Sequence, residues 1–276
     1  MGTLYVVATP IGNLEEMSPR AIATLKSVNL IACEDTRRSA TLLRAFNIET
    51  PMISYHKHNL RSREDRLLRA LTEGDVALIS DAGTPGIADP GLELVEAAHR
   101  EGIRVVPISG PSAVASAVSV AGFVKGPFLF LGFLTRTGDE RRAELARAAA
   151  VGYPVVIYES PVRLGETIAD LAAVFGGRRA MVARELSKLH EELAHGTLVD
   201  LRDRYADAEV KGEIVIVIDG ATESVSVEID VRAVIRGMLE QGMKPSRIAR
   251  EAASLTDMPG SDVYELVREL QRETPS

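Results

Sequence analysis

Residues 80–91 read SDAGTPGIADPG and follow directly on the apolar run Val76–Ile79. Three glycines, two prolines and two aspartates fall within these residues. Glycine allows positive φ angles and lets backbone N–H groups approach a ligand, whereas proline stiffens a loop. Because ligands of open α/β sheets bind outside the carboxyl ends of the strands, this stretch predicts a ligand-binding loop. It also fits an ordinary strand-to-helix turn, with Asp89 as the helix cap and Pro90 in the first turn.

Outward from this loop, short apolar runs alternate with helical patterns. We expect buried strands at residues 4–8, 30–33, 76–79 and 105–108, and helices near 18–27, 36–46, 61–73 and 91–101. Strands that alternate with helices predict an α/β fold whose parallel sheet is covered on both faces.

A second α/β set follows a cluster of glycine and proline near residues 122–126. We expect its strands at 128–133, 155–158, 181–183 and 214–218, and its helices at 138–150 and 161–174. A polar linker then leads to three short helices within 231–272, separated by Gly242 and by Pro259-Gly260. The predicted domains are 1–121, 122–222 and a small helical domain at 223–276, of helix-turn-helix type. The cleft between the first two is the natural ligand site.

Two further loops have binding chemistry. TPIGNL (9–14) follows the first strand, and Ser18-Pro19 should begin the next helix. If strands 4–8 and 76–79 are neighbours, their loops face each other across one crevice. SGPSA (109–113) follows strand 105–108, and its small residues permit flat packing against a nucleoside, or simply close helix–sheet packing.

Charged residues follow the strand at 30–33. In Glu34-Asp35-Thr36-Arg37-Arg38, the carboxylates could handle protons and the arginines bind phosphate, although Asp35 also fits a helix cap. The run 55–59 (YHKHN) leads into Arg61, Arg63 and Arg66. This is either a local RNA-facing surface, which Arg136, Arg141 and Arg142 could extend, or a solvated loop.

Composition limits the classes of function. The chain has 276 residues, a formal net charge of −7 and 46% hydrophobic residues, which argues against a general nucleic-acid coat protein. Its single cysteine, Cys33, allows no internal disulfide and fits a reducing cytosol. No apolar run approaches the ~18 residues of a membrane span, and we expect no signal peptide because a strand begins at once.

Several familiar motifs are missing. No G-x-G-x-x-G follows a strand, and no glycine-rich loop ends in Gly-Lys-Ser/Thr, so neither a standard dinucleotide site nor a Walker nucleotide site is expected. His190 and His195 resemble a zinc helix, but they are spaced by five residues rather than four and would face different sides of it. We therefore expect no metal.

Seven segments together resemble one family. They are ATPIGNLEEMSPRA, ACEDTRRSATLL, SYHKHN, ISDAGTPGIADPG, PISGPSA, YESPVRL and KGEIVIVI. In order and spacing they are similar to the ribosomal RNA small subunit methyltransferase I group of the tetrapyrrole methylase superfamily, the class III methyltransferases. The resemblance implies two α/β domains with S-adenosylmethionine between them, and a homodimer. It also implies 2′-O-methylation of a cytidine in the decoding region of small-subunit (16S) ribosomal RNA, in the cytoplasm.

The resemblance also implies site residues. Tetrapyrrole methylases proper carry Gly-Asp-Pro and Gly-Pro-Gly where this chain has Ser80–Pro85 and Thr9–Gly12, so their cofactor role carries over but their substrate does not. The implied cofactor contacts are Pro10, Asp81, Gly83, Thr84, Ser112, Ala113, Tyr158, Leu186 and Gly212.

A ribose hydroxyl is a poor nucleophile until it loses its proton, so a general base should assist. Glu34 or Asp35 is our hypothesis, with His56 as the alternative. The expected RNA-binding residues are Arg37, Arg38, Lys57, Arg61 and Arg63. The helix that begins near Lys244-Pro245, with Arg247 and Arg250, could also contact RNA or simply stabilise the chain.

Two other functions remain open from the residues. A small-molecule methylase would turn over without RNA and have no use for the basic run near 57–66. A nucleotide-sensing regulator would bind a ligand without methyl transfer and use its C-terminal helices on DNA.

Overall fold

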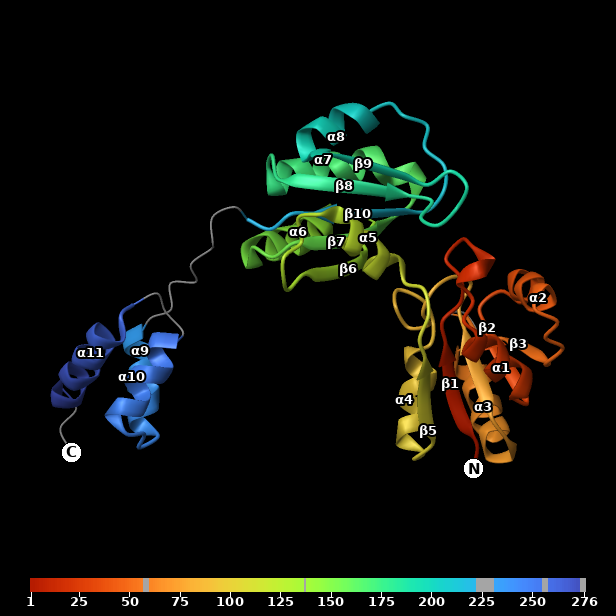
Figure 1. Cartoon of the computed structure of the whole chain (residues 1–276), viewed down its shortest axis with the longest axis horizontal. Helices are drawn as coiled ribbons and strands as arrows, with labels where there is room; N and C mark the ends of the chain where they lie inside the picture. The colour runs from red at the N-terminus through yellow and green to blue at the C-terminus, as the bar shows by residue number, and fades with distance from the viewer. Residues whose placement is uncertain (57–59, 137, 222–230, 255–257, 274–276) are drawn as a thin grey trace. The chain divides into compact units, whose positions relative to one another are not determined.

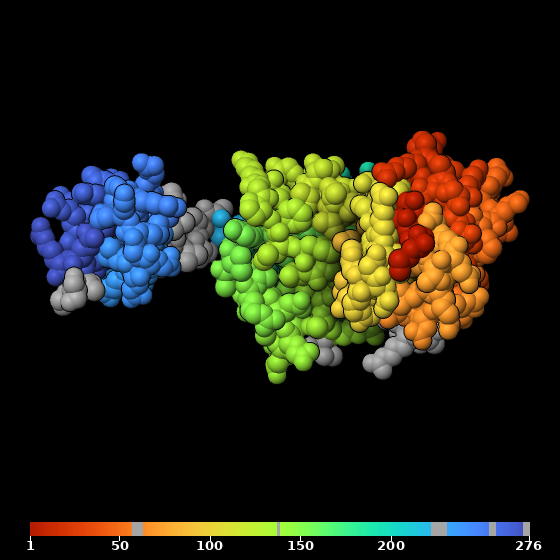
Figure 2. All heavy atoms as spheres, turned by 90° about the horizontal axis from the view of Figure 1, so that it is seen from below, coloured from red at the N-terminus to blue at the C-terminus, as the bar shows by residue number. Residues whose placement is uncertain are grey.

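The computed structural model describes residues 1–56, 60–136, 138–221, 231–254 and 258–273 (Figure 1). Contacts divide the chain into two compact units, Met1–Thr222 and Glu223–Ser276. In the space-filling view the described atoms of the first unit pack as one continuous body (Figure 2).

The first sheet confirms the parallel architecture. Its five strands run in the order β3-β2-β4-β1-β5, and each pairs with its neighbours in parallel. They are β1 (Thr3–Val7), β2 (Leu30–Cys33), β3 (Met52–Ser54), β4 (Val76–Ile79) and β5 (Arg104–Ile108). We did not predict β3, because a run of only three residues carries too little periodicity to be recognised.

Helices cover both faces of this sheet. They are α1 (Pro19–Ser27), α2 (Thr36–Ala45), α3 (Leu60–Glu73) and α4 (Leu92–Arg100), with a 3₁₀ turn η1 (Leu14–Glu16) before α1. Leu25 of α1 and Leu43 of α2 share one apolar cluster with Ile79, whereas Leu67 of α3 and Leu94 of α4 pack in another. Successive strand residues point to opposite faces, so each strand feeds both clusters.

The start of α4 corrects one expectation. The cap is Gly91, at φ 144°, and neither Asp89 as cap nor Pro90 in the first turn is correct. A φ in this region favours glycine, and the turn it makes leaves Asp89 in the loop. Ser18 does cap α1, with Pro19 in its first turn, as predicted.

The second sheet is mixed. Its order is β6-β7-β10-β8-β9; β6 and β7 are parallel and the other pairs antiparallel. The strands are β6 (Leu129–Phe133), β7 (Val155–Glu159), β8 (Arg179–Arg184), β9 (Glu192–Thr197) and β10 (Ile214–Ile218). One face packs against α6 (Gly138–Val151), α7 (Leu164–Phe175) and α8 (Leu198–Tyr205), and a 3₁₀ turn η2 (Pro161–Arg163) precedes α7.

The other face of the second sheet packs against α5 (Ala113–Ala121), through Val114 and Ala117. Helix α5 thus follows β5 of the first sheet in the chain but packs on the second sheet, although the predicted boundary assigns its residues to the first domain. The expected division into 1–121 and 122–222 stays a prediction.

The segment from His190 to His195 is not helical. His190 lies in a turn and His195 in β9, so the helical premise of our zinc argument was wrong. Neither β9 nor α8 was predicted. Within the described ranges no group of three or more His, Cys, Asp or Glu side chains is placed to hold a metal ion.

The second unit contains the three expected helices, α9 (Val231–Glu240), α10 (Pro245–Ser254) and α11 (Gly260–Glu273). They enclose an apolar core of their own, in which Ile235, Ile248 and Val267 are fully buried. Among the helices that the structure describes, none is long and apolar enough to cross a membrane.

Candidate active site

The loops after β1 and β4 are joined to each other. The amide of Thr9 donates to the carbonyl of Gly83 at 2.8 Å, and the amide of Gly83 donates to the carbonyl of Thr9 at 3.1 Å. The buried Thr9 hydroxyl also donates to the carbonyl of Ser80 at 3.2 Å. Strands β1 and β4 are paired neighbours, as the prediction required, but their loops are hydrogen-bonded to each other and do not face each other across a crevice.

The loop after β5 completes this edge of the sheet. The Thr84 hydroxyl donates to the carbonyl of Pro111 at 3.5 Å. A Cβ atom at Gly110 would lie 2.9 Å from the Cβ of Ala8, so only glycine allows the loops to approach this closely.

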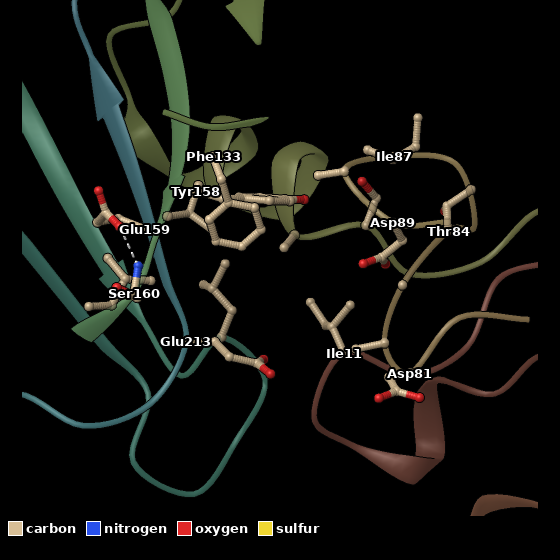
Figure 3. Close-up of a pocket in the computed structure, with 18 of the residues that line it drawn as sticks. Ile11, Asp81, Thr84, Ile87, Asp89, Phe133, Tyr158, Glu159, Ser160 and Glu213 are labelled. Atoms are coloured by element: carbon tan, nitrogen blue, oxygen red, sulfur yellow. Dashed lines mark hydrogen bonds between the residues drawn. The ribbon is translucent and has the colours of Figure 1, made fainter. Parts of the chain in front are cut away.

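These loops form one wall of a cavity of about 410 Å³ (Figure 3). The opposite wall comes from the ends of β6 and β7, from Leu186, and from residues 212–215 before and within β10. The expected cofactor residues that line the cavity are Asp81, Gly83, Thr84, Ser112, Ala113, Tyr158, Leu186 and Gly212. Pro10 is not among the lining residues, whereas its neighbour Ile11 is.

Asp81 connects this cavity to the charged cluster after β2. Its Oδ1 accepts a hydrogen bond from the amide of Asp35 at 3.1 Å, and its Oδ2 lies 3.5 Å from the guanidinium of Arg38. Through these two contacts the Asp81 carboxylate holds the loop after β4 against the residues that follow β2, and it also lines the cavity.

A second cavity of about 490 Å³ adjoins the first. It is lined by Glu34, Asp35, Thr36, Arg37, Arg38, Ser54, His56 and Asp81. The two cavities share Glu34, Arg38 and Asp81. The structure therefore brings together the three candidate bases and two of the expected RNA-binding arginines.

The remaining basic residues are less well placed. Lys57 lies outside the described residues, and the side chain of Arg61 is likewise not described. Arg63 lies in α3 and lines neither cavity.

Asp35 and Tyr158, which line the two cavities, have shifted pKa values. Asp35 caps α2, and the hydrogen bond from the Arg37 amide, at 2.8 Å, lowers the pKa of Asp35 below its ordinary value. Its carboxylate is thus a weak base that is already engaged by the helix. Burial raises the pKa of Tyr158 to about 12, so the phenol stays protonated at neutral pH and does not act as a base.

Sequence reasoning missed several lining residues, among them Ile11, Asp89, Phe133, Glu159 and Glu213. Glu159 lies within the quoted YESP motif, which was the available signal. It is buried, and its carboxylate accepts hydrogen bonds from the Ser160 amide at 2.7 Å and from the Thr167 hydroxyl at 2.5 Å.

The loops of the two sheets also meet beside the cavity. A Cβ atom at Gly12 would collide with Lys188, so the loop after β1 lies directly against the loop after β8. Lys188 donates to Glu185 at 2.7 Å and to Glu213 at 3.1 Å. Gly212, at φ 99°, would bring a Cβ atom within 2.5 Å of the Glu185 side chain.

This two-sheet arrangement has known counterparts. Residues 3–202 match the family model of the tetrapyrrole (corrin/porphyrin) methylases. Among solved structures, a cobalt precorrin-4 methyltransferase aligns with a TM-score of 0.61 at 15% identity, over 79% of this chain and 94% of the other. The uroporphyrin-III C-methyl transferase of Thermus thermophilus, complexed with S-adenyl homocysteine, aligns with a TM-score of 0.57 at 18% identity, over 79% and 97%. These similarities define the class as the tetrapyrrole methylase fold.

Curated relatives narrow the class further. The ribosomal RNA small subunit methyltransferase I of Synechocystis sp. is 43% identical over 99% of this chain and 100% of its own length. The chain therefore belongs to the ribosomal RNA small subunit methyltransferase I family of the tetrapyrrole methylases.

Proposed function

We propose that this protein transfers a methyl group from S-adenosylmethionine to the 2′-hydroxyl of a cytidine ribose in the decoding region of 16S ribosomal RNA. The observation that carries the proposal is the junction of two cavities at Glu34, Arg38 and Asp81. One cavity has the glycine-containing loops suited to a nucleoside cofactor, and the other has the charged groups suited to a ribose phosphate. The name of the relatives supports RNA as the substrate.

The residues of the first cavity fit the cofactor. The lining carries more carboxylates than cations, with Asp81, Asp89, Glu159 and Glu213 among them and Arg38 opposing. Such a lining favours a ligand that bears a sulfonium and an ammonium charge. At the start of α5 the Ser112 side chain makes no capping hydrogen bond, which leaves amide donors for polar groups of the ligand. When bound, the cofactor supplies a methyl group activated by the sulfonium.

The chain must then orient the hydroxyl and remove its proton. Glu34 is the base we favour, because it lines both cavities, whereas Asp35 caps α2. The hydroxyl oxygen has to lie roughly 3 Å from the methyl carbon and in line with the bond that breaks. The proton passes from the ribose oxygen to the Glu34 carboxylate as the methyl group is transferred.

Arg37 and Arg38 are the proposed phosphate ligands. Their side chains are 92% and 70% exposed at the wall of the second cavity, where guanidinium groups can hold phosphate oxygens in pairs. The proposed assembly is a homodimer, which sedimentation of the purified protein would reveal, and the proposed setting is the cytoplasm, where small ribosomal subunits assemble.

The test is methyl transfer from labelled S-adenosylmethionine to small ribosomal subunits from cells that lack this gene. The rRNA is then digested and mapped by mass. We expect a single 2′-O-methylcytidine in the decoding region. Cofactor binding without transfer to subunits or to naked rRNA would refute the proposal and point to a small-molecule substrate or a ligand sensor.

A further inference from the structure

An aromatic ring lies exposed at the cavity. Phe133 is 57% exposed and lines the cavity of about 410 Å³. Only 4% of the residues in this chain are aromatic and none is tryptophan, so an exposed phenylalanine at a ligand site is conspicuous. Figure 3 shows its ring beside Tyr158, facing the loop of Thr84 and Asp89 across the cavity.

A β-bulge places this ring. Leu129 and Leu131 pack on the face of the second sheet covered by α6–α8, and strand alternation would send Phe133 to the same face. The pairing of β6 with β7 shifts register between Phe130 and Gly132, and Gly132 has φ 64°. An extra residue in a strand moves the following side chain to the opposite face. Phe133 is thereby directed toward the cavity.

Its neighbours keep the ring in position. Phe133 packs edge-to-face on Tyr158, with ring centroids 5.5 Å apart, and Phe130 contacts the same tyrosine at 4.9 Å. Arg163 donates to the carbonyls of Leu134 and Thr135, at 3.4 and 3.3 Å, which fixes the chain just after the ring. The site is thus built to present a rigid aromatic surface.

We propose that Phe133 is a stacking platform for a nucleobase of the RNA substrate. This inference rests on the proposed function and adds to it a contact with the base. Aromatic side chains bind unpaired bases through their π-faces and do so without strict sequence preference. The ring is more than half exposed, so a base of the RNA can reach it from solvent. Arg136, also exposed, follows three residues later and offers a charge to the adjoining phosphate.

The test compares Phe133→Leu and Phe133→Trp with the wild-type enzyme. Phe128→Leu is the matched control, because Phe128 is 38% exposed, precedes the same strand and does not line the cavity. Removing the platform for one stacked base should raise the KM for small subunits roughly tenfold in Phe133→Leu. The affinity for S-adenosylhomocysteine should not change, Phe133→Trp should keep the wild-type KM, and Phe128→Leu should behave as wild type.

Three results would overturn the inference and leave the proposed function standing. An unchanged KM for subunits in Phe133→Leu means that no base stacks on the ring. A weaker affinity for S-adenosylhomocysteine, with RNA affinity intact, assigns the ring to the cofactor. An equal effect in Phe128→Leu shows that the cause is general stability. Wild-type enzyme that methylates no rRNA refutes the proposed function itself and, with it, this inference.

Discussion

At the scale of single residues, Glu34 and Asp35 are adjacent in sequence but differ in their surroundings. Glu34 lines both cavities, while Asp35 caps α2. We expect Glu34→Gln to lower kcat by roughly 10²–10³-fold, because the variant keeps the shape and loses the base. Its affinity for S-adenosylhomocysteine should remain as in wild type. Single-turnover methyl transfer to small subunits measures the effect.

Asp35→Asn is the matched control for this experiment. Asparagine also caps helices well, so this variant should fold normally and keep most of its activity. If Asp35→Asn lost as much activity as Glu34→Gln, the base would not be assigned to Glu34. If neither variant lost activity, both carboxylates would be excluded, and His56, which lines the second cavity, would be tested next.

A second prediction at this scale concerns the ion pair of Lys188 with Glu185. Burial opposes the charge on Glu185, but hydrogen bonds from Lys188 and from the Glu213 amide prevail and lower the pKa of Glu185 from 4.5. Burial likewise opposes the charge on Lys188, yet bonding to both glutamates raises the pKa of Lys188 above 10.5. A lowered carboxyl pKa adds stability above pH 4.5 that is lost as the pH falls through the lowered value.

Lys188→Met should therefore reduce the free energy of unfolding by about 1 kcal/mol at pH 7. The deficit relative to wild type should shrink as the pH falls through the lowered pKa of Glu185, and also as the pH rises through the raised pKa of Lys188. Urea denaturation at a series of pH values measures it. A deficit that is independent of pH would show that the effect comes from packing of the lysine stem and not from its charge.

At the scale of elements, the hydroxyl of Thr9 joins the loops after β1 and β4. Thr9→Val preserves the shape of this fully buried side chain and removes its hydrogen bonds to the carbonyls of Ser80 and Gly83. We expect the free energy of unfolding to fall by about 1 kcal/mol and the affinity for S-adenosylhomocysteine to weaken with it. Calorimetry on the same sample gives both quantities. Reduced stability with unchanged affinity would show that the loop geometry does not depend on this link.

A second link between elements runs through Thr167 of α7. The buried Arg141 donates to its hydroxyl at 3.0 Å, and that hydroxyl donates to the buried carboxylate of Glu159. Thr167→Val leaves the buried carboxyl group of Glu159 without this donor, so the free energy of unfolding should fall by about 2 kcal/mol. Thermal unfolding measures the change.

Thr72→Val is the matched control for Thr167→Val. The Thr72 hydroxyl is exposed and bonds only locally, to the carbonyl of Arg69, so its removal should change stability by less than about 0.5 kcal/mol. Equal destabilisation in the two variants would mean that the buried chain of hydrogen bonds adds nothing specific.

The sequence predicted the elements whose signals are local. Buried strands such as β4 and β10 are continuous apolar runs between turn residues, and Ser18-Pro19 is a self-contained helix start. It could not predict β3 or β9, which are recognisable only through their pairing partners. The bulge in β6 is likewise a property of two strands, and this is why Phe133 was overlooked.

The candidate site was also only partly predictable, because some of its features have local sequence signals and others depend on contacts between distant residues. Motifs identified Asp81, Thr84 and Tyr158, all of which line the cavity. The hydrogen bond from the amide of Asp35 to Asp81 joins residues far apart in the chain, so the connection between the two charged clusters became visible only in the folded structure.

At the scale of the whole molecule, the chain consists of two units that each enclose their own apolar core. Helix α10 is amphipathic, because Ile248 and Ala249 are buried while Arg247 and Arg250 are exposed, as is Lys244 just before the helix. A unit with its own core can be removed without exposing the other's core. The basic face of α10 is therefore open to direct test.

We expect a protein that ends at residue 222 to fold and to bind S-adenosylhomocysteine as tightly as the full chain, because every residue that lines the proposed cofactor cavity lies before that point. Its affinity for small subunits should fall, and the dependence of binding on salt should become shallower by about one unit of log–log slope for each phosphate that the helical unit neutralises. The full-length double variant Lys244→Gln, Arg250→Gln keeps the helical unit and removes two exposed cations. It therefore shows whether the lost affinity for subunits comes from these charges or from the absence of the unit as a whole. If the shortened protein bound subunits with unchanged affinity and salt slope, the helical unit would have no part in RNA binding and would serve only the stability of the chain.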